Sequence, residues 1–359
     1  MTGGSGPALD FETRLAHVAG LEAPEPRSRS LVEIGRSRED RPILACRLGR
    51  GATRISLLGG CHADEPVGPR LLARLVSALE ALAPDDPLLT ELAWWILPHI
   101  NPDGAARNAG WQGPDDAAYR LSDYLAGVRR ELPGDDIEFG FPRGPGDEGA
   151  RREPAAAAAW WSTAGGPFDL HATLHGMAFA AGPWFLVEPA WVARAGPLMD
   201  CCRTRVAELG YRLHDVERQG EKGFHRIAPG FATRPDSTAM REHFLARGDA
   251  ETSGRFRPSS MEHIRSLGGD PLTLVSEMPL FLLPGVGEEL GPPDPAAERW
   301  RERIAGWRAR LATGEDGAPI DAEAADAGLR TMPVEDQMRL QWTLIATAID
   351  LAREGAASP

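Results

Sequence analysis

Two short apolar segments with a helical segment between them set the strongest limit on how this chain can fold. Residues 54–58 (RISLL) form an apolar run that ends at two glycines, and residues 92–100 (LAWWILPHI) form a second run. Between them, residues 68–82 repeat leucines at the spacing of one helix face. Apolar runs that alternate with a helix are typical of buried strands in a largely parallel sheet. The sequence therefore predicts an α/β fold.

The remaining elements follow from the same periodicities. The segments that predict strands are residues 30–34, 42–48, 168–173, 184–187 and 271–278, and those that predict helices are residues 10–20, 192–209, 295–311 and 334–353. Residues 105–155 are rich in Gly, Pro, Asp and Arg and show little periodicity, so we expect a long ordered loop there.

Charge and composition exclude several classes of function. The chain has 39 Lys and Arg against 52 Asp and Glu, a net charge of −13, whereas a general nucleic-acid binder needs a basic face. The most apolar region, residues 176–195, is interrupted by prolines and charges, so we expect no membrane span. Four cysteines without a CxxC pair favour reduced thiols and a cytoplasmic protein. The oligomeric state stays open.

Potential metal ligands follow two of the predicted strands. His62 and Glu65 lie three residues apart after the first run, and His171 ends the short run at residues 168–171. Glu277 is a carboxylate inside an otherwise apolar strand, where an unpaired charge is costly. Two histidines, one glutamate and an open position are typical of a catalytic zinc site. His175 is the alternative to His171 as the second histidine, and the neighbouring Cys61 is either a soft ligand or a buried thiol.

These motifs, in their order along the chain, resemble those of the zinc carboxypeptidase (peptidase M14) family. The motifs are HADE at residues 62–65, NPDG at 101–104, DLH at 169–171 and the late Glu277. The resemblance implies a three-layer α/β/α sandwich with a mixed, twisted central sheet. It further implies a catalytic domain over residues 1–286, to which we add a C-terminal helical extension over residues 287–359.

The resemblance also assigns roles to individual residues. His62, Glu65 and His171 would hold one zinc ion, and Glu277 would be the general base. Arg129 falls on the arginine that polarises the scissile carbonyl, with Arg130 as its neighbour one position out of register. Residues with supporting or substrate-binding roles would be Asp169, Asn101, Asp103 and His175.

One departure from the family pattern bears on the substrate. Where the family carries an Asn-Arg pair that grips a terminal carboxylate, this chain has Glu138 and Phe139. A glutamate there repels a carboxylate, so we expect the recognised end of the substrate to differ, for example by carrying an amine. The family tyrosine before the catalytic glutamate is also missing, and His243 and His263 are candidates to replace it.

The sequence thus predicts a zinc hydrolase that cleaves an amide or peptide bond in a peptide or small amide. Two alternatives remain. One is a deacylase of N-acyl amino acids, of the aspartoacylase and succinylglutamate desuccinylase type. The other is a metal-binding pseudoenzyme, although pure metal binding does not need a carboxylate at Glu277.

Overall fold

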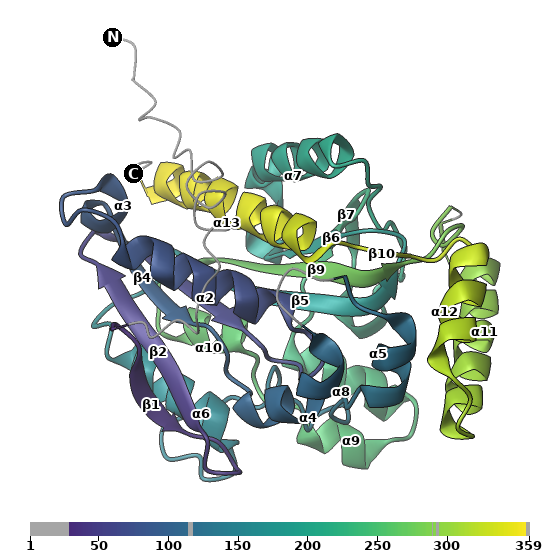
Figure 1. Cartoon of the computed structure of the whole chain (residues 1–359). Coiled ribbons are helices and arrows are strands. Elements are labelled where there is room, and N and C mark those ends of the chain that lie inside the picture. The colour runs from purple at the N-terminus through teal and green to yellow at the C-terminus, as the bar shows by residue number, and fades with distance from the viewer. Residues whose placement is uncertain (1–28, 114–117, 289, 292–293, 357–359) are drawn as a thin grey trace.

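A mixed sheet of ten strands runs through the protein, and the structure, a computed structural model, describes residues 29–113, 118–288, 290–291 and 294–356 of the chain (Figure 1). The strand order is β1-β2-β4-β3-β5-β9-β6-β8-β7, with β10 beside β9. The strands are β1 (Val32–Arg36), β2 (Pro42–Gly49), β3 (Thr53–Gly59), β4 (Leu92–Leu97), β5 (Leu170–Ala180), β6 (Trp184–Val187), β7 (Arg226–Ala228), β8 (Phe231–Thr233), β9 (Leu272–Leu282) and β10 (Arg330–Thr331).

Parallel pairing is concentrated in the middle of the sheet. Strands β4, β3, β5 and β9 pair in parallel, and antiparallel pairs flank them on both sides. Because the carboxyl ends of parallel strands meet at one edge of a sheet, loops that follow β3 and residues late in β5 and β9 come together there.

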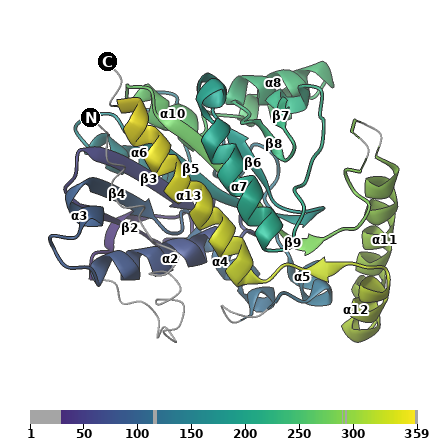
Figure 2. The ribbon, with the colours of Figure 1, turned by 90° about the horizontal axis from the view of Figure 1, so that it is seen from above.

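Helices cover both faces of the sheet. They are α2 (Val67–Glu80), α3 (Pro87–Thr90), α4 (Pro102–Gln112), α5 (Leu121–Gly127), α6 (Arg152–Ser162), α7 (Gly196–Glu208), α8 (Ser237–Ala246), α9 (Ala250–Arg255), α10 (Ser260–Ser266), α11 (Pro295–Ala312), α12 (Gly317–Asp326) and α13 (Val334–Ala356), with short 3₁₀ turns η1 (Pro189–Arg194) and η2 (Glu221–Gly223). One face carries α2, α13 and α7 side by side, as Figure 2 shows from above. The other face carries α6 and α10. This arrangement confirms the predicted α/β/α sandwich with a mixed sheet.

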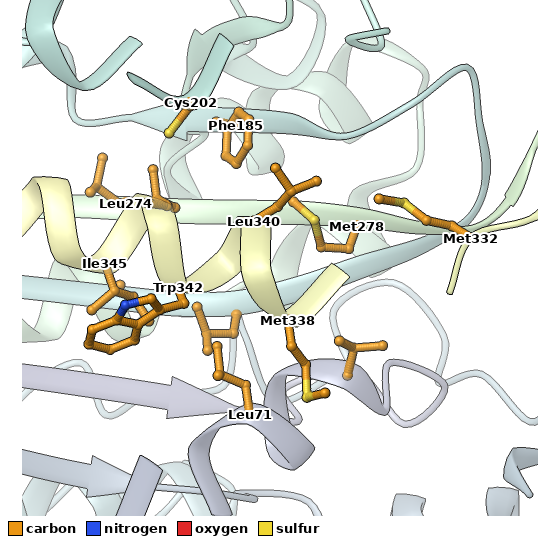
Figure 3. Packing of buried hydrophobic residues seen from close by; sticks show 14 of the residues in the cluster. Leu71, Phe185, Cys202, Leu274, Met278, Met332, Met338, Leu340, Trp342 and Ile345 are labelled. Atoms are coloured by element: carbon orange, nitrogen blue, oxygen red, sulfur yellow. The ribbon is translucent and has the colours of Figure 1, made fainter. Parts of the chain in front are cut away.

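The last helix packs inside the main core. Leu340 and Ile345 of α13 are buried with Leu71 of α2, Cys202 of α7 and Leu274 of β9 (Figure 3). Their burial removes apolar surface from water at about 25 cal/mol per Å². The C-terminal residues therefore help to hold the sheet on which the site is built, while the division of the chain at residue 286 stays a prediction.

The structure corrects the prediction for one segment, and the prediction for another segment lies outside the described residues. Residues 105–155 are not one long loop, because they include most of α4, all of α5 and the start of α6. Asn101 explains the first of these, since its side chain accepts a hydrogen bond from the Gly104 amide and starts α4 as an N-cap. The helix expected at residues 10–20 lies outside the described residues. Among the described helices, none is both long and apolar enough to cross a membrane, and all four cysteines are free.

Candidate metal centre

Three donor groups converge at the carboxyl end of the central strands. His62 and Glu65 come from the loop between β3 and α2, and His175 comes from β5. The Nδ1 atom of His62 lies 2.7 Å from Glu65 Oε1, and that of His175 lies 3.0 Å from Glu65 Oε2. The two Nδ1 atoms are 3.2 Å apart. Two imidazoles and one carboxylate therefore present their donor atoms to one point.

Glycines allow the loop to approach β5 so closely. Gly60 has a left-handed φ of +74°, and a Cβ on it would lie 2.4 Å from the His99 ring. Gly68, in the first turn of α2, would place a Cβ 2.5 Å from the carbonyl oxygen of Leu174, the residue before His175. A side chain at Gly68 would push the start of α2 away from β5, and a side chain at Gly60 would push the loop away from His99, so both glycines allow the loop its present position.

The charges of the donors depend on one another. Burial alone would lower the pKa of His62, but the Glu65 carboxylate outweighs it and raises that pKa to about 9. Burial would also lower the pKa of His175, but the Glu65 carboxylate outweighs burial and raises that pKa well above its usual value. Burial would raise the pKa of Glu65, but the two imidazoles hold it well below the ordinary range. Without a metal, protons supply the positive charge that this buried carboxylate requires.

The donor set fits a zinc ion. A tetrahedral site with ligand bonds of ~2.0–2.1 Å spaces its donor atoms about 3.3 Å apart. The observed spacings of 2.7, 3.0 and 3.2 Å are close to this value. Nitrogen and carboxylate donors with three protein ligands match catalytic zinc sites, which keep a fourth position open. His62, Glu65 and His175 could therefore hold a zinc ion.

Glu277 lies beside this cluster on the neighbouring strand. In the parallel register of β5 and β9, Glu277 is the partner of His175. Burial raises the pKa of Glu277 to about 7, and the charge of Glu65 acts in the same direction. A carboxyl group with such a pKa can take up and release a proton near neutral pH.

A second carboxylate supports His175 from behind. Glu138 Oε2 lies 3.4 Å from His175 Nε2, the ring nitrogen that faces away from Glu65. Glu138 is only 4% exposed, and its other oxygen accepts a hydrogen bond from Ser260. Cys61 is buried beside this pair. Burial is the main cause that raises the pKa of its thiol well above the usual value, and the charge of Glu138 is the second cause. The geometry assigns Glu138 to His175, so the reason for expecting an amine on the substrate no longer holds.

The arginine that faces the site is Arg130, one position from the prediction. Its Nε lies 3.2 Å from Asp64 Oδ2, and its Nη2 lies 4.0 Å from Glu65 Oε1. The guanidinium of Arg129 instead donates to the backbone carbonyls of Ala126 and Val128 and is exposed. The arginine that faces the donors is therefore the one that follows Arg129 in the chain.

The prediction that His171 joins His62 and Glu65 is wrong. His171 pairs with Thr273 in the strand register, whereas His175 pairs with Glu277. Four residues along a strand correspond to about 13 Å, so His171 cannot reach the cluster. It is fully buried near Ser56, with its Nδ1 2.9 Å from Ser56 Oγ.

Asp169 does not orient a ligand imidazole either. Its carboxylate accepts a hydrogen bond from the Arg54 amide at 2.7 Å, at the start of β3 and β5. This position lies at the opposite end of the strands from the donor cluster.

Asn101 and Asp103, two further predicted site residues, make contacts that hold the fold together and do not touch the donor atoms. Asn101 starts α4, whose Gly104 packs against Ala63 in the ligand loop, and its side-chain amide donates to Glu131, the residue after Arg130. Asp103 accepts a hydrogen bond from Ser37 and pairs with Arg41. These partners account for its buried carboxylate and leave no ligand-orienting role for Asp103.

Phe139 and the two candidate donor histidines lie in other contacts. The Phe139 ring is 7% exposed and packs on Phe256 at 5.4 Å, so it does not line an open substrate site. His263 stacks near Phe141 and Trp161, and His243 faces Glu221 at 3.7 Å. In the described part of the chain neither histidine contacts the donor cluster, so neither takes the place of the missing tyrosine.

Two charged residues near the cluster were missed. Asp136 is half-buried, and its charge helps to raise the pKa of His62. Its signal was available, since it matches the family motif in the aligned segment. Arg218 affects Glu277 electrostatically from the chain after α7. No local pattern marks Arg218, because its place depends on the tertiary fold.

Comparisons with known proteins agree on one family. The family model of zinc carboxypeptidases matches residues 15–177. Carboxypeptidase B of Astacus astacus is 29% identical over 101 residues, which are 27% of this chain and 33% of that protein. Carboxypeptidase D of Drosophila melanogaster is 27% identical over 176 residues, 45% of this chain and 12% of that protein. The matches thus span a third or less of these relatives.

Solved structures give weaker likenesses. A metallo-carboxypeptidase from Burkholderia cenocepacia has a TM-score of 0.47 and 14% identity, with 96% of this chain and 69% of that chain covered. A metallo-carboxypeptidase from Pseudomonas aeruginosa, in complex with (2-guanidinoethylmercapto)succinic acid, has a TM-score of 0.46 and 16% identity, with the same two coverages.

Proposed function

We propose, from the premise that this chain belongs to the zinc carboxypeptidase family, that it is a zinc-dependent hydrolase of an amide or peptide bond. The observation that carries the proposal is the convergence of His62, Glu65 and His175 on one point with Glu277 on the adjacent strand. Metal binding alone does not call for a partly buried carboxylate with a pKa near 7 at that place.

Each residue of the site has a separate role in the proposed hydrolysis. Zinc held by His62, Glu65 and His175 would supply a Lewis acid for the amide carbonyl and for water. Glu277 takes a proton from the attacking water and passes it to the leaving amine. Arg130, fixed by Asp64, places positive charge where the carbonyl oxygen becomes negative, a contribution of about 3 kcal/mol for one such donor.

The substrate end is recognised without the family Asn-Arg pair. Residues 138 and 139 are both buried in other contacts, so neither grips a terminal carboxylate in the family manner. We therefore propose atypical recognition of a peptide or small amide. Because the Asn-Arg pair is missing, a deacylase of N-acyl amino acids stays the second candidate function. The cytoplasmic location expected from the cysteines stays a prediction.

The test combines metal analysis with a substrate screen. The purified protein is supplied with zinc, its metal content is measured, and blocked peptides, free peptides and N-acyl amino acids are screened by mass spectrometry. We expect one zinc ion per chain and the release of an amine from at least one amide. Activity on N-acyl amino acids alone would favour the deacylase.

A Glu277→Gln variant provides the matched control, because it keeps the size of the side chain and removes the base. It is expected to retain zinc and lose hydrolysis by about 10²–10⁴-fold. A protein that binds no zinc contradicts the proposal. A protein that binds zinc but hydrolyses none of the amides favours the pseudoenzyme.

A further inference from the structure

Arg218 is an ionised side chain that the proposed chemistry does not use. It lies in the chain between α7 and β7, and its Cζ is 5.3 Å from the centroid of the Trp184 ring and 4.6 Å from that of Phe224. Within the described part of the chain, its guanidinium has no ion pair within 4.0 Å and no hydrogen bond. Burial lowers the pKa of Arg218, and the charges of Glu277 and Glu221 oppose this effect without forming an ion pair with it. A half-buried guanidinium with no anion in direct contact is costly.

The strand register places Arg218 relative to the metal centre. Glu277 on β9 is the partner of His175 on β5 and also of Trp184 on β6. Partners on adjacent strands point to the same face of a sheet, and strands lie about 4.8 Å apart. His175, Glu277 and Trp184 thus form a row about 10 Å long. Arg218 lies over the Trp184 end, on the side of Glu277 away from the metal donors.

The surroundings of Arg218 combine apolar walls with a second cation, Lys222, and with the carboxylates of Glu221 and Glu277. Trp184 belongs to a buried cluster with Leu186, Ala232, Met261 and Val275, against which Met177 and Phe224 pack. Burial is the main cause that lowers the pKa of Lys222. The charge of Glu221 raises this pKa, and the charge of Arg218 lowers it, so Lys222 lies close to Arg218. A cation fixed on two aromatic rings beside apolar side chains suits an organic anion better than a hydrated inorganic one.

We propose that Arg218, with the rings of Trp184 and Phe224, forms a subsite that binds a carboxylate of the substrate and the apolar group attached to it. The proposal rests on the proposed function in one respect, because that function identifies the bound carboxylate as part of the substrate. Arg218 belongs to a segment about 80 residues after the aligned motif, so the subsite would replace the missing Asn-Arg pair from elsewhere in the fold.

Binding of a matched pair of probes tests the subsite without turnover. Hydrocinnamate carries a carboxylate on an aromatic group, and hydrocinnamyl alcohol is its neutral counterpart; neither has an amide to cleave. Calorimetry on the zinc-loaded protein is expected to show about 10-fold tighter binding of the acid, the size of one hydrogen-bonded charge pair. Arg218→Met should abolish this preference, and Arg218→Lys should restore part of it.

Arg247→Met is the control, because Arg247 lies in the same region but is 62% exposed and pairs with Glu221. It should keep the full preference for the acid. Equal binding of the two probes to the wild type, undetectable binding included, overturns the proposal. A preference that survives Arg218→Met also overturns it, since the carboxylate would then be held by the zinc or another cation. Neither outcome depends on whether the protein hydrolyses amides.

Discussion

Replacing Glu138 by glutamine isolates the contribution of the carboxylate behind His175. Glutamine keeps the size of the side chain and can still accept a hydrogen bond, but it removes the negative charge 3.4 Å from His175 Nε2. A carboxylate in this position fixes the ring and makes the ligating nitrogen more basic, and its loss costs 10–100-fold in metal affinity. This range corresponds to about 1.4–2.7 kcal/mol.

The structure places the expected loss in the upper part of that range. Glu138 is 4% exposed, so water cannot take over its role, and Oε2 has no hydrogen-bond partner within the described residues. Burial would raise the pKa of Glu138, but His175 outweighs this effect and lowers it, so the group is ionised at neutral pH. Its charge is therefore directed mainly at His175.

The assay is competition for zinc between the protein and a chromogenic chelator at neutral pH. Glu153→Gln is the matched control, because Glu153 is also fully buried but pairs with Arg151 away from the donors. We expect a large rise in the zinc Kd for Glu138→Gln and little change for Glu153→Gln. Equal zinc affinity of Glu138→Gln and the wild type, with both variants folded by circular dichroism, would refute the role of Glu138.

Three further predictions follow from the geometry. Arg130→Met should reduce kcat about 10²–10³-fold on any amide that the protein hydrolyses, whereas Arg129→Met should leave kcat unchanged, and steady-state kinetics will decide between them. His175→Ala should lose the zinc that metal analysis finds in the wild type, and His171→Ala should keep it; the reverse result would restore the first assignment. Burial lowers the pKa of His171 to about 3, so its neutral form stabilises the fold fully above pH ~6.5, and this contribution falls by up to about 1.4 kcal/mol per pH unit below it. Chemical unfolding of His171→Asn in the presence of a chelator should depend less steeply on pH between about 6 and 4 than unfolding of the wild type.

The general position of the site could be predicted because it follows from strand ends. His62 and Glu65 follow an apolar run that is consistent with a buried strand, and Glu277 is a carboxylate in such a run, where it needs a partner or a function. Parallel strands bring these positions to one edge of the sheet. The positions of all three residues could therefore be expected from the order of elements and the cost of burying charge, while their roles came from the resemblance to the zinc carboxypeptidases.

The choice between His171 and His175 needed information that periodicity does not contain. Residues four apart in a strand point to the same face, so both histidines fit the pattern equally well. The sequence pattern predicts a strand that ends at residue 173, whereas β5 continues through Gly176 to Ala180. Ending the strand too early moved the predicted ligand away from the end where the loop after β3 arrives.

Arg218 marks a further limit, because its place depends on three separate segments. It meets the site only because β6 pairs with β9, Trp184 falls opposite Glu277, and the chain after α7 returns over that ring. A shift of one residue in the β6–β9 register would turn Trp184 to the other face of the sheet and remove the support of the guanidinium. Recognition of the substrate end by the proposed subsite would thus depend on pairings distant in sequence, whereas the proposed metal donors depend on two strand ends. This difference explains why the motifs indicate a chemistry but not a substrate.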